Sequence, residues 1–134
     1  MSFLQLTKKR YSVRAYKPDP VEGEKLKQIL EAARMAPTAC NLQPFRLIVI
    51  HTKGKEAELK HIYSTPWFVQ APIVICICGI PSHGWFRRDG RSYCDVNVII
   101  AIDHLIFCCY KPSTWHLLDR CIRSRCSTRC VGIT

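Results

Sequence analysis

The apolar run from Ile73 to Gly79 limits the possible folds more than any other part of this 134-residue chain. Its length argues against a helix, and it is rich in β-branched side chains, which favour strands. Because the run does not alternate with polar residues, both faces of such a strand must be covered by other elements. The sequence therefore predicts a sheet with packed layers on both of its sides.

A second apolar segment, from Cys94 to Phe107, has the spacing of a helix. Its apolar side chains surround the helix axis instead of forming one stripe, and a helix of this kind is typically buried on all sides. We therefore expect this helix to be deeply buried and able to line a dimer interface. Its apolar positions include Val96, Val98, Ile99, Ile100, Ile102, Leu105 and Ile106.

The rest of the pattern mixes helices with strands, which predicts an α+β fold. Asp19-Pro20 is typical of a helix start, since Asp caps the first turn and Pro fits the first helical position. That helix must stop before Pro37. In chain order we also expect a short helix around Phe3–Leu6, a strand over Arg46–Thr52, a helix over Lys53–Tyr63 with Leu59 and Ile62 inward, a short helix or turn at Trp67–Val69, and a loop over Pro81–Tyr93.

Length and composition predict one domain, because a chain of this size buries roughly two-thirds of its unfolded surface and 48% of its residues are apolar. No apolar segment reaches the ~18 residues that span a bilayer, and the N-terminus lacks the pattern of a secretory signal. We therefore expect a cytoplasmic protein that does not insert into a membrane.

The net charge of +10 and the nine Cys are unevenly distributed along the chain. Residues 1–107 hold 15 Lys and Arg against nine Asp and Glu, and they contain four Cys. Residues 108–134 hold five Lys and Arg against one Asp, and they contain the other five Cys. Because the composition changes near Phe107, we treat residues 1–107 and 108–134 as two separate parts.

Two Arg and one Ser lie close together at Arg10, Ser12 and Arg14, just after the first predicted helix. Guanidinium groups match the geometry of phosphate oxygens and keep their charge, and a Ser hydroxyl with nearby backbone N–H groups can fill the remaining acceptor positions. Such a set suits a phosphate, although the same pattern in isolation is more often a solvated surface.

A second loop runs from Pro37 to Pro44, with the sequence Pro-Thr-Ala-Cys-Asn-Leu-Gln-Pro, and leads into the first strand. One predicted helix separates this loop from the Arg-x-Ser-x-Arg pattern, and a strand, a helix, a buried strand and a buried helix follow it. With the two motifs in this order, residues 1–107 resemble the nitroreductase family of flavin-dependent oxidoreductases. The resemblance implies a sheet flanked by helices, FMN as cofactor, NADH or NADPH as co-substrate, and a homodimer.

The resemblance also implies which residues hold FMN: Arg10, Ser12, Arg14, Pro37, Thr38, Ala39, Asn41 and Gln43. The Arg side chains and the Ser hydroxyl would bind the phosphate, and the Asn and Gln amides would pair with the polar edge of the flavin ring without adding charge. In this family the Pro-Thr-Ala backbone typically contacts the flavin of the facing subunit.

Hydride transfer is the chemistry of the flavin itself, so we expect no catalytic side chain. The five His are scattered along the chain and are better explained as surface or hydrogen-bonded residues than as acids or bases. The partner would be a small electron acceptor such as a nitroaromatic or a quinone. The sequence does not indicate which acceptor is used, or whether NADH or NADPH is preferred.

The tail departs from the family pattern. Pro112 would break a continuing helix, and from Trp115 onward Arg alternates with Cys, which is a poor match to a central strand. One permitted set of codons for Phe107–Arg129, read from its second base, gives FAATNLRLGTCWIAAFDPDAAR, which looks like the family's missing continuation. The choice among synonymous codons changes only the middle base of most shifted triplets, so this agreement is hard to obtain by chance. We therefore interpret Cys108 to about Arg129 as out-of-frame translation.

This interpretation predicts an incomplete fold that lacks the C-terminal half of the family's domain, and it could leave the 134-residue product inactive.

Two other functions stay open. The basic charge, His116 and the Arg-rich segment Cys121–Cys130 favour a small module that binds nucleic acid or zinc, but the Cys spacing lacks the pairing of common zinc modules and no aromatic residues interleave with the basic ones. The other is a flavin-binding protein without turnover. We rank both below the oxidoreductase and predict neither a metal nor nucleic acid as a partner.

Overall fold

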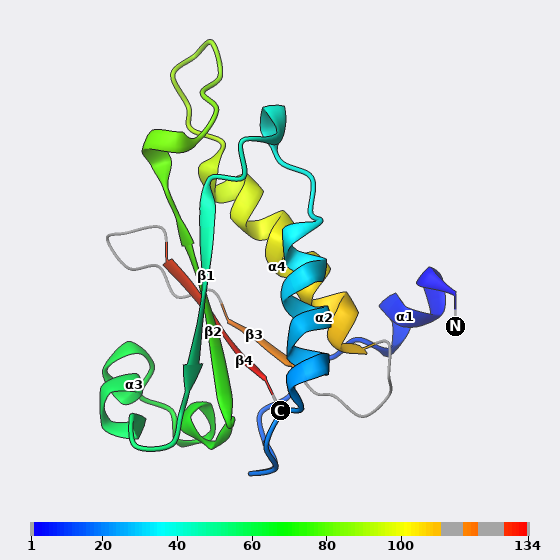
Figure 1. The fold of residues 1–134 in the computed structure, drawn as a ribbon, viewed down its shortest axis with the longest axis vertical. Coiled ribbons are helices and arrows are strands. Elements are labelled where there is room, and N and C mark those ends of the chain that lie inside the picture. The colour runs from blue at the N-terminus through cyan, green and yellow to red at the C-terminus, as the bar shows by residue number, and fades with distance from the viewer. Residues whose placement is uncertain (1, 111–116, 121–127, 134) are drawn as a thin grey trace.

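The computed structural model describes residues 2–110, 117–120 and 128–133, the last two ranges by their backbone alone. Four antiparallel strands form one sheet in the order β1-β2-β4-β3, with helices beside it (Figure 1). The α+β prediction is therefore confirmed. The helices are α1 (Phe3–Lys9), α2 (Gly23–Arg34), α3 (Glu56–Ile62) and α4 (Cys94–Tyr110); the strands are β1 (Phe45–His51), β2 (Ile73–Gly79), β3 (Leu117–Arg120) and β4 (Thr128–Ile133); and single 3₁₀ turns lie at η1 (Ala39–Asn41), η2 (Pro66–Gln70) and η3 (Pro81–His83).

Strand β2 is buried on both faces, as the apolar run predicts. On one face Ile75 and Ile77 are fully buried in a core cluster that includes residues of α2 and α4. On the opposite face Val74 packs with Leu59 of α3 and Phe68 of η2. The alternation of side chains along the strand thus feeds two separate cores, and the sheet lies between two layers.

Helix α2 begins at Gly23, three residues after Pro20, the predicted first helical position. Its N-cap is Glu22, whose backbone is extended and whose side chain makes no capping hydrogen bond. The residue before it, Val21, packs against the main core. Packing of Val21 against the core competes with the helix start that Asp19 favours. The backbone therefore stays extended up to Glu22, and the helix begins after it.

Helix α3 is also shorter than predicted, because a turn with Gly54 at φ +83° precedes its start at Glu56. Its inward residue Leu59 is 2% exposed, as predicted. The prediction that Ile62 also points inward is wrong, since Ile62 is 41% exposed. The helix ends at this residue, and the extended Tyr63 that follows packs its ring 5.2 Å from the ring of Trp67, centre to centre.

Helix α4 extends three residues beyond its predicted end, to Tyr110. Val98 and Leu105 are fully buried against α2 and the sheet. The prediction of burial on all sides is wrong, because Val96 is 42% and Ile99 46% exposed. Among the described residues, the other elements cover only one side of the helix and leave an apolar face open.

The tail contains a central strand, contrary to the sequence prediction. Strand β4 pairs with β2 on one side and with β3 on the other. Ladder hydrogen bonds come from the backbone, so a segment without Pro can pair even where its side chains follow no strand pattern. The predicted helix break at Pro112 lies outside the described residues, and so do His116, Cys121 and Cys126 of the zinc alternative.

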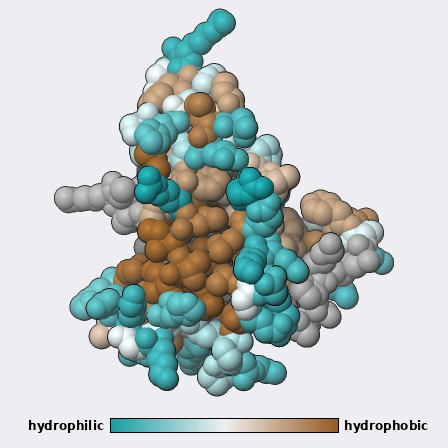
Figure 2. All heavy atoms as spheres, viewed as in Figure 1, coloured by the Kyte–Doolittle hydropathy of each residue, from teal (hydrophilic) through white to brown (hydrophobic). Residues whose placement is uncertain are grey.

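The edge of the sheet at β1 carries an apolar patch, which Figure 2 shows over β1 and β2 beside α2. Leu47 and Val49 are half-buried there, and Ile48 is 47% exposed. An uncovered apolar strand edge is a typical place for another chain to pair.

Within the described ranges, none of the helices has the length and apolar character that a membrane crossing requires.

Candidate functional site

The first predicted loop, Arg10–Arg14, connects α1 to the extended segment before α2. Val13 is 7% exposed and fixes the middle of the loop to the protein. In extended backbone, successive side chains point to opposite sides, so a buried Val13 leaves its neighbours outside. Arg10, Ser12 and Arg14 are all exposed.

The two guanidinium groups of this loop are not committed to carboxylates. Among the described residues the ion pairs join Glu22, Glu24, Glu31 or Asp89 to other Lys and Arg side chains, and none includes Arg10 or Arg14. Two permanent positive charges beside an exposed Ser12 are therefore available to an anion. This donor set fits a phosphate group.

The backbone of the first loop is held by Tyr110, at the C-terminal end of α4. The Tyr110 hydroxyl donates a hydrogen bond to the carbonyl oxygen of Tyr11, and the Tyr11 N–H lies 3.4 Å from the same hydroxyl oxygen. The two rings pack edge to face, with centres 6.2 Å apart. Tyr110 is 7% exposed, and burial raises the pKa of its hydroxyl above the ordinary value. The hydroxyl therefore remains a neutral donor at physiological pH.

The second predicted loop, Pro37–Pro44, has an unusual backbone. Three of its non-glycine residues are left-handed, with φ of 52° at Cys40, 53° at Asn41 and 46° at Gln43. Such residues are strained by roughly 1–2 kcal/mol each, and clusters of them are typical of functional sites. The surrounding structure must hold this loop in place.

Hydrogen bonds from two sides provide this support. The Ala39 N–H donates to Asn97 Oδ1 at 3.0 Å, and Asn97 lies in the first turn of α4 with only 1% exposure. Inside the loop, the Gln43 N–H donates to Thr38 Oγ1 at 3.0 Å. The Cys94 thiol donates to the carbonyl oxygen of Pro44 at 3.4 Å. The loop is thereby fixed to the N-terminal end of α4.

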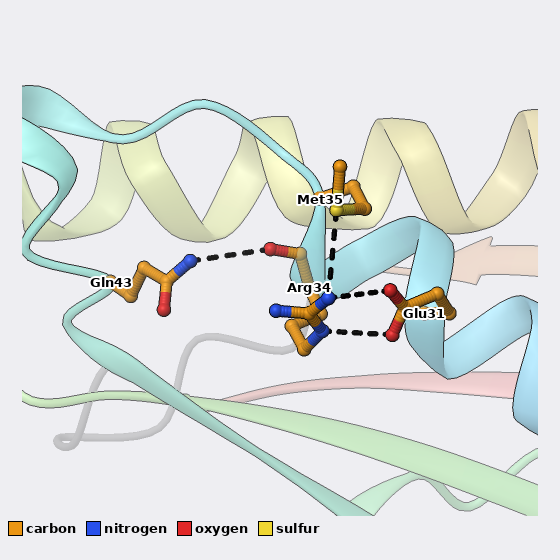
Figure 3. Close-up of polar contacts among 4 residues, drawn as sticks. All are labelled: Glu31, Arg34, Met35 and Gln43. Atoms are coloured by element: carbon orange, nitrogen blue, oxygen red, sulfur yellow. Dashed lines mark hydrogen bonds and ion pairs between the residues drawn. The ribbon is translucent and has the colours of Figure 1, made fainter.

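The Gln43 side chain turns toward the end of α2 (Figure 3). Its Nε2 donates to the carbonyl oxygen of Arg34 at 3.3 Å. The Arg34 guanidinium in turn donates to both carboxylate oxygens of Glu31, at 2.6 and 2.8 Å, and this hydrogen bonding lowers the pKa of Glu31 and raises that of Arg34. The Gln43 side chain therefore ties the second loop to the C-terminal end of α2. The Glu31 carboxylate partly neutralises the charge of Arg34.

The structure does not bring the two loops together within one chain. The first is attached through Tyr110 and the second through Asn97, at opposite ends of α4 (Figure 1). Thirteen residues of helix separate these two anchors, which corresponds to about 20 Å. The predicted residues thus fall into two separate groups, which we call the two half-sites of the predicted site: Arg10, Ser12 and Arg14 in one, and Pro37, Thr38, Ala39, Asn41 and Gln43 in the other.

Two cavities lie among the described residues, and neither contains Arg10, Ser12 or Arg14. A cavity of about 190 Å³ beside the second loop is lined by Arg34, Gln43, Phe45 and Leu47, which is smaller than the roughly 300–1,000 Å³ of ligand sites. A larger cavity of about 400 Å³ contains none of the predicted site residues. Among the described residues, no group of three His, Cys, Asp or Glu could hold a metal ion.

Asn97 and Tyr110 form hydrogen bonds with the two loops, and the sequence analysis predicted neither contact. Asn97 had a signal, because it is the single polar residue in the apolar stretch from Val96 to Ile102, and a buried amide needs a partner. Tyr110 had none, since it lies in the part of the chain that departs from the family pattern.

Comparison with known proteins gives consistent relatives. Residues 7–75 match the Nitroreductase family. The NADH dehydrogenase of Thermus thermophilus is 39% identical over 70 residues, which are 52% of this chain and 34% of that protein. The FMN reductase, NAD(P)H, of Bacillus subtilis is 34% identical over 68 residues, 50% of this chain and 27% of that protein.

A solved structure matches almost the whole chain. The crystal structure of a nitroreductase family protein from Clostridium difficile 630 superposes with a TM-score of 0.83 and 31% identity, and the match covers 99% of this chain and 83% of that one. The two sequence relatives are matched over only 27–34% of their length. The likeness of fold therefore includes almost all of this chain, whereas the two sequence relatives match it over about half of its length.

Proposed function

Because this chain belongs to the nitroreductase family, we propose that it is part of an FMN-dependent oxidoreductase that takes hydride from NADH or NADPH and reduces a small molecule such as a nitroaromatic or a quinone. We propose further that it acts as a cytoplasmic homodimer. The FMN reductase name of one relative supports the cofactor and the co-substrate.

The residues of the first loop suit the phosphate end of FMN. Arg10 and Arg14 supply charged donors that no described carboxylate neutralises, and Ser12 lies exposed between them. When bound, FMN supplies the hydride acceptor and donor. The task of this chain is then to bind the phosphate, orient the ring and exclude water.

The second loop suits the ring of FMN. Its left-handed backbone at Cys40 and Asn41 is held rigidly through the Ala39–Asn97 hydrogen bond. A fixed backbone presents its N–H and C=O groups in one geometry, and the exposed Asn41 amide adds a neutral donor and acceptor. Contacts of this kind orient a flavin without placing a charge beside it.

The separation of the two half-sites is the observation that carries the proposal of a shared site. One chain holds them at opposite ends of α4, about 20 Å apart along the helix. A two-fold dimer pairs the first loop of one subunit with the second loop of the other. The exposed face of α4 at Val96 and Ile99 offers apolar area for such contact.

Mixing two variants tests the proposal. In one variant Arg10→Gln and Arg14→Gln remove the phosphate donors; in the other Asn41→Ala removes the amide of the second loop. Each is expected to bind FMN weakly alone. Refolded together in equal amounts, they should recover tight binding at about a quarter of the sites, because half of the dimers are mixed and each of these has one intact site. Flavin fluorescence quenching measures the bound fraction.

Riboflavin, which lacks the phosphate, serves as the control ligand. The Arg variant should lose affinity for FMN and keep that of the wild type for riboflavin, whereas the Asn41 variant should lose both. If mixing the two variants restores no tight FMN binding, a site shared between subunits is excluded. Failure of the wild-type chain to bind FMN at all would contradict the proposed function for this product.

A further inference from the structure

An ordered hairpin projects from the sheet between β2 and α4 (Figure 1). The Arg87 N–H donates to the carbonyl oxygen of Arg91 at 2.9 Å, and the Gly90 N–H donates to that of Arg87 at 2.9 Å. Gly90 has a φ of +80°, which the tight turn requires. Phe86 and Ser92 pair below the turn. The tip therefore has a defined conformation.

Three Arg occupy this turn, at positions 87, 88 and 91. Asp89 lies 3.0 Å from the Arg87 guanidinium and 3.9 Å from that of Arg91, so one carboxylate is shared by two cations. Arg88 is exposed and has no ion-pair partner among the described residues. The turn thus has an excess of two positive charges and one guanidinium whose donors are all available.

Aromatic side chains lie at the base of the same hairpin. Phe86 is 51% and Trp85 36% exposed. The Trp85 ring packs edge to face on Tyr93, with centres 5.1 Å apart, and the Tyr93 N–H donates to the Trp85 carbonyl oxygen at 2.9 Å. Exposed aromatic faces next to guanidinium groups are the chemistry that binds a nucleotide: the base stacks on a ring and the phosphate takes the Arg donors.

The base of the hairpin is tied to the second loop of the proposed flavin site. The Ile80 N–H donates to the carbonyl oxygen of Pro44 at 2.7 Å, and the Cys94 thiol donates to the same oxygen at 3.4 Å. Pro44 directly follows Gln43. The two ends of the hairpin segment therefore meet where the second loop enters β1.

We propose that this hairpin binds the 2′-phosphate of the adenosine end of NADPH, with Arg88 as its main contact, and so makes NADPH the preferred hydride donor. The inference rests on the proposed function for the identity of the dinucleotide. With the nicotinamide at the flavin, the adenosine would reach the hairpin, where Phe86 or Trp85 would stack on its base. NADH lacks the 2′-phosphate and gains nothing from Arg88.

Adenosine 2′,5′-bisphosphate is the probe that isolates this contact, and calorimetric titration of the full chain measures its binding. Adenosine 3′,5′-bisphosphate has the same charge and serves as the control ligand. The wild type should bind the 2′ isomer about tenfold more tightly, as expected for one charge-assisted contact. Arg88→Gln should remove the difference between the isomers, and Arg46→Gln, an exposed Arg of β1, should preserve it.

A gain of affinity provides the converse test. Asp89→Asn keeps a side-chain oxygen for the Arg91 N–H, which donates to Asp89 Oδ1 at 3.2 Å, but it removes the carboxylate that neutralises the neighbouring guanidinium groups. The preference for the 2′ isomer should then increase. Equal binding of the two isomers by the wild type, or a preference that survives Arg88→Gln, would overturn the inference.

This titration needs neither FMN nor turnover, so the two proposals can fail separately. FMN binding with equal kcat/KM for NADH and NADPH would remove the hairpin inference and leave the proposed function. Selective binding of the 2′ isomer by a chain that takes up no FMN would keep the phosphate site and contradict the oxidoreductase.

Discussion

The two loops of the proposed site are built in opposite ways. The Arg10–Arg14 loop has no left-handed residue and one buried side chain, and its backbone forms hydrogen bonds with Leu6 and Tyr110. The Pro37–Pro44 loop has three left-handed residues and hydrogen bonds to α2, to α4 and within itself. The first loop therefore carries two positive charges, whereas the second is uncharged and has a strained backbone.

The difference follows from what each loop is proposed to bind. A phosphate attracts guanidinium groups over several ångströms, and long side chains adjust to it, so the backbone needs only approximate placement. A flat neutral ring edge is recognised by short hydrogen bonds with strict geometry. The backbone that supplies them must be fixed in advance, and this requires buried partners such as Asn97.

Replacing the tail is expected to have the largest effect. We propose that Cys108 to about Arg129 arises from out-of-frame translation, and a chain carrying AATNLRLGTCWIAAFDPDAAR in its place tests this. Its free energy of unfolding should rise by several kcal/mol, since each large apolar side chain that becomes buried contributes roughly 1.5–3 kcal/mol. Urea titration measures the change.

The same replacement should affect the two loops differently. The supports of the second loop, Asn97 and Thr38, precede the replaced segment, so its amide exchange should stay unchanged, whereas the first loop loses Tyr110 and must find a new partner. A replaced chain no more stable than the original, together with an uninterrupted gene in the original frame, would contradict the proposal.

Asn97→Ala should disrupt the second loop alone. The loss of a buried hydrogen bond and the cavity left behind should lower the free energy of unfolding by about 2 kcal/mol. Hydrogen exchange of the Ala39 amide, which donates to Asn97, should become faster. The adjacent Val98→Ala, at an equally buried position that faces the core, is the control: it should destabilise without exposing Ala39. Equal Ala39 exchange in both variants would show that the contact does not hold the loop.

Tyr110→Phe should loosen the first loop with a loss of about 1 kcal/mol, the usual contribution of one hydrogen bond. Trypsin should then cut faster after Arg10 and Arg14. Tyr93→Phe makes the same chemical change at the other end of α4 and should leave cleavage unchanged. Unaltered cleavage in Tyr110→Phe would mean that packing alone holds this loop.

Alkaline pH gives a second readout of the same contact. Burial raises the pKa of Tyr110 in the folded chain above its ordinary value of 10.0, so the unfolded chain releases this proton first as the pH rises. The resulting stabilisation is full below about pH 10 and decreases above it. Tyr110→Phe lacks this contribution, and its unfolding free energy should therefore fall less steeply between pH 9 and 11 in urea titrations.

Cys40→Gly should have the smallest effect. The left-handed φ of 52° at this exposed residue is unfavourable for a side chain and neutral for Gly. Relief of this strain exceeds the added entropy of the unfolded chain only slightly, so stability should rise by about 0.5 kcal/mol. Cys40→Ala keeps the strain and should change nothing. A Gly variant that is less stable than the Ala variant would indicate that the side chain supports the loop.

Much of the fold could be predicted from the sequence because its signals are local. The short, β-branched apolar run predicted β2 with its correct bounds, and the helical spacing of apolar residues predicted α4. Helix ends were less predictable, as α2 shows: the capping signal at Asp19 competes with burial of Val21, and no local pattern shows which one prevails.

The sequence by itself determined the chemistry of the two loops, since residue type decides that Arg10 and Arg14 can bind a phosphate and that Asn41 can pair with a polar ring. Only the tertiary structure decided that the loops lie at opposite ends of α4, that Asn97 and Tyr110 hold them, and that β4 enters the middle of the sheet. These features depend on contacts between residues far apart in the chain, and burial and backbone pairing select such contacts only when the whole chain has folded.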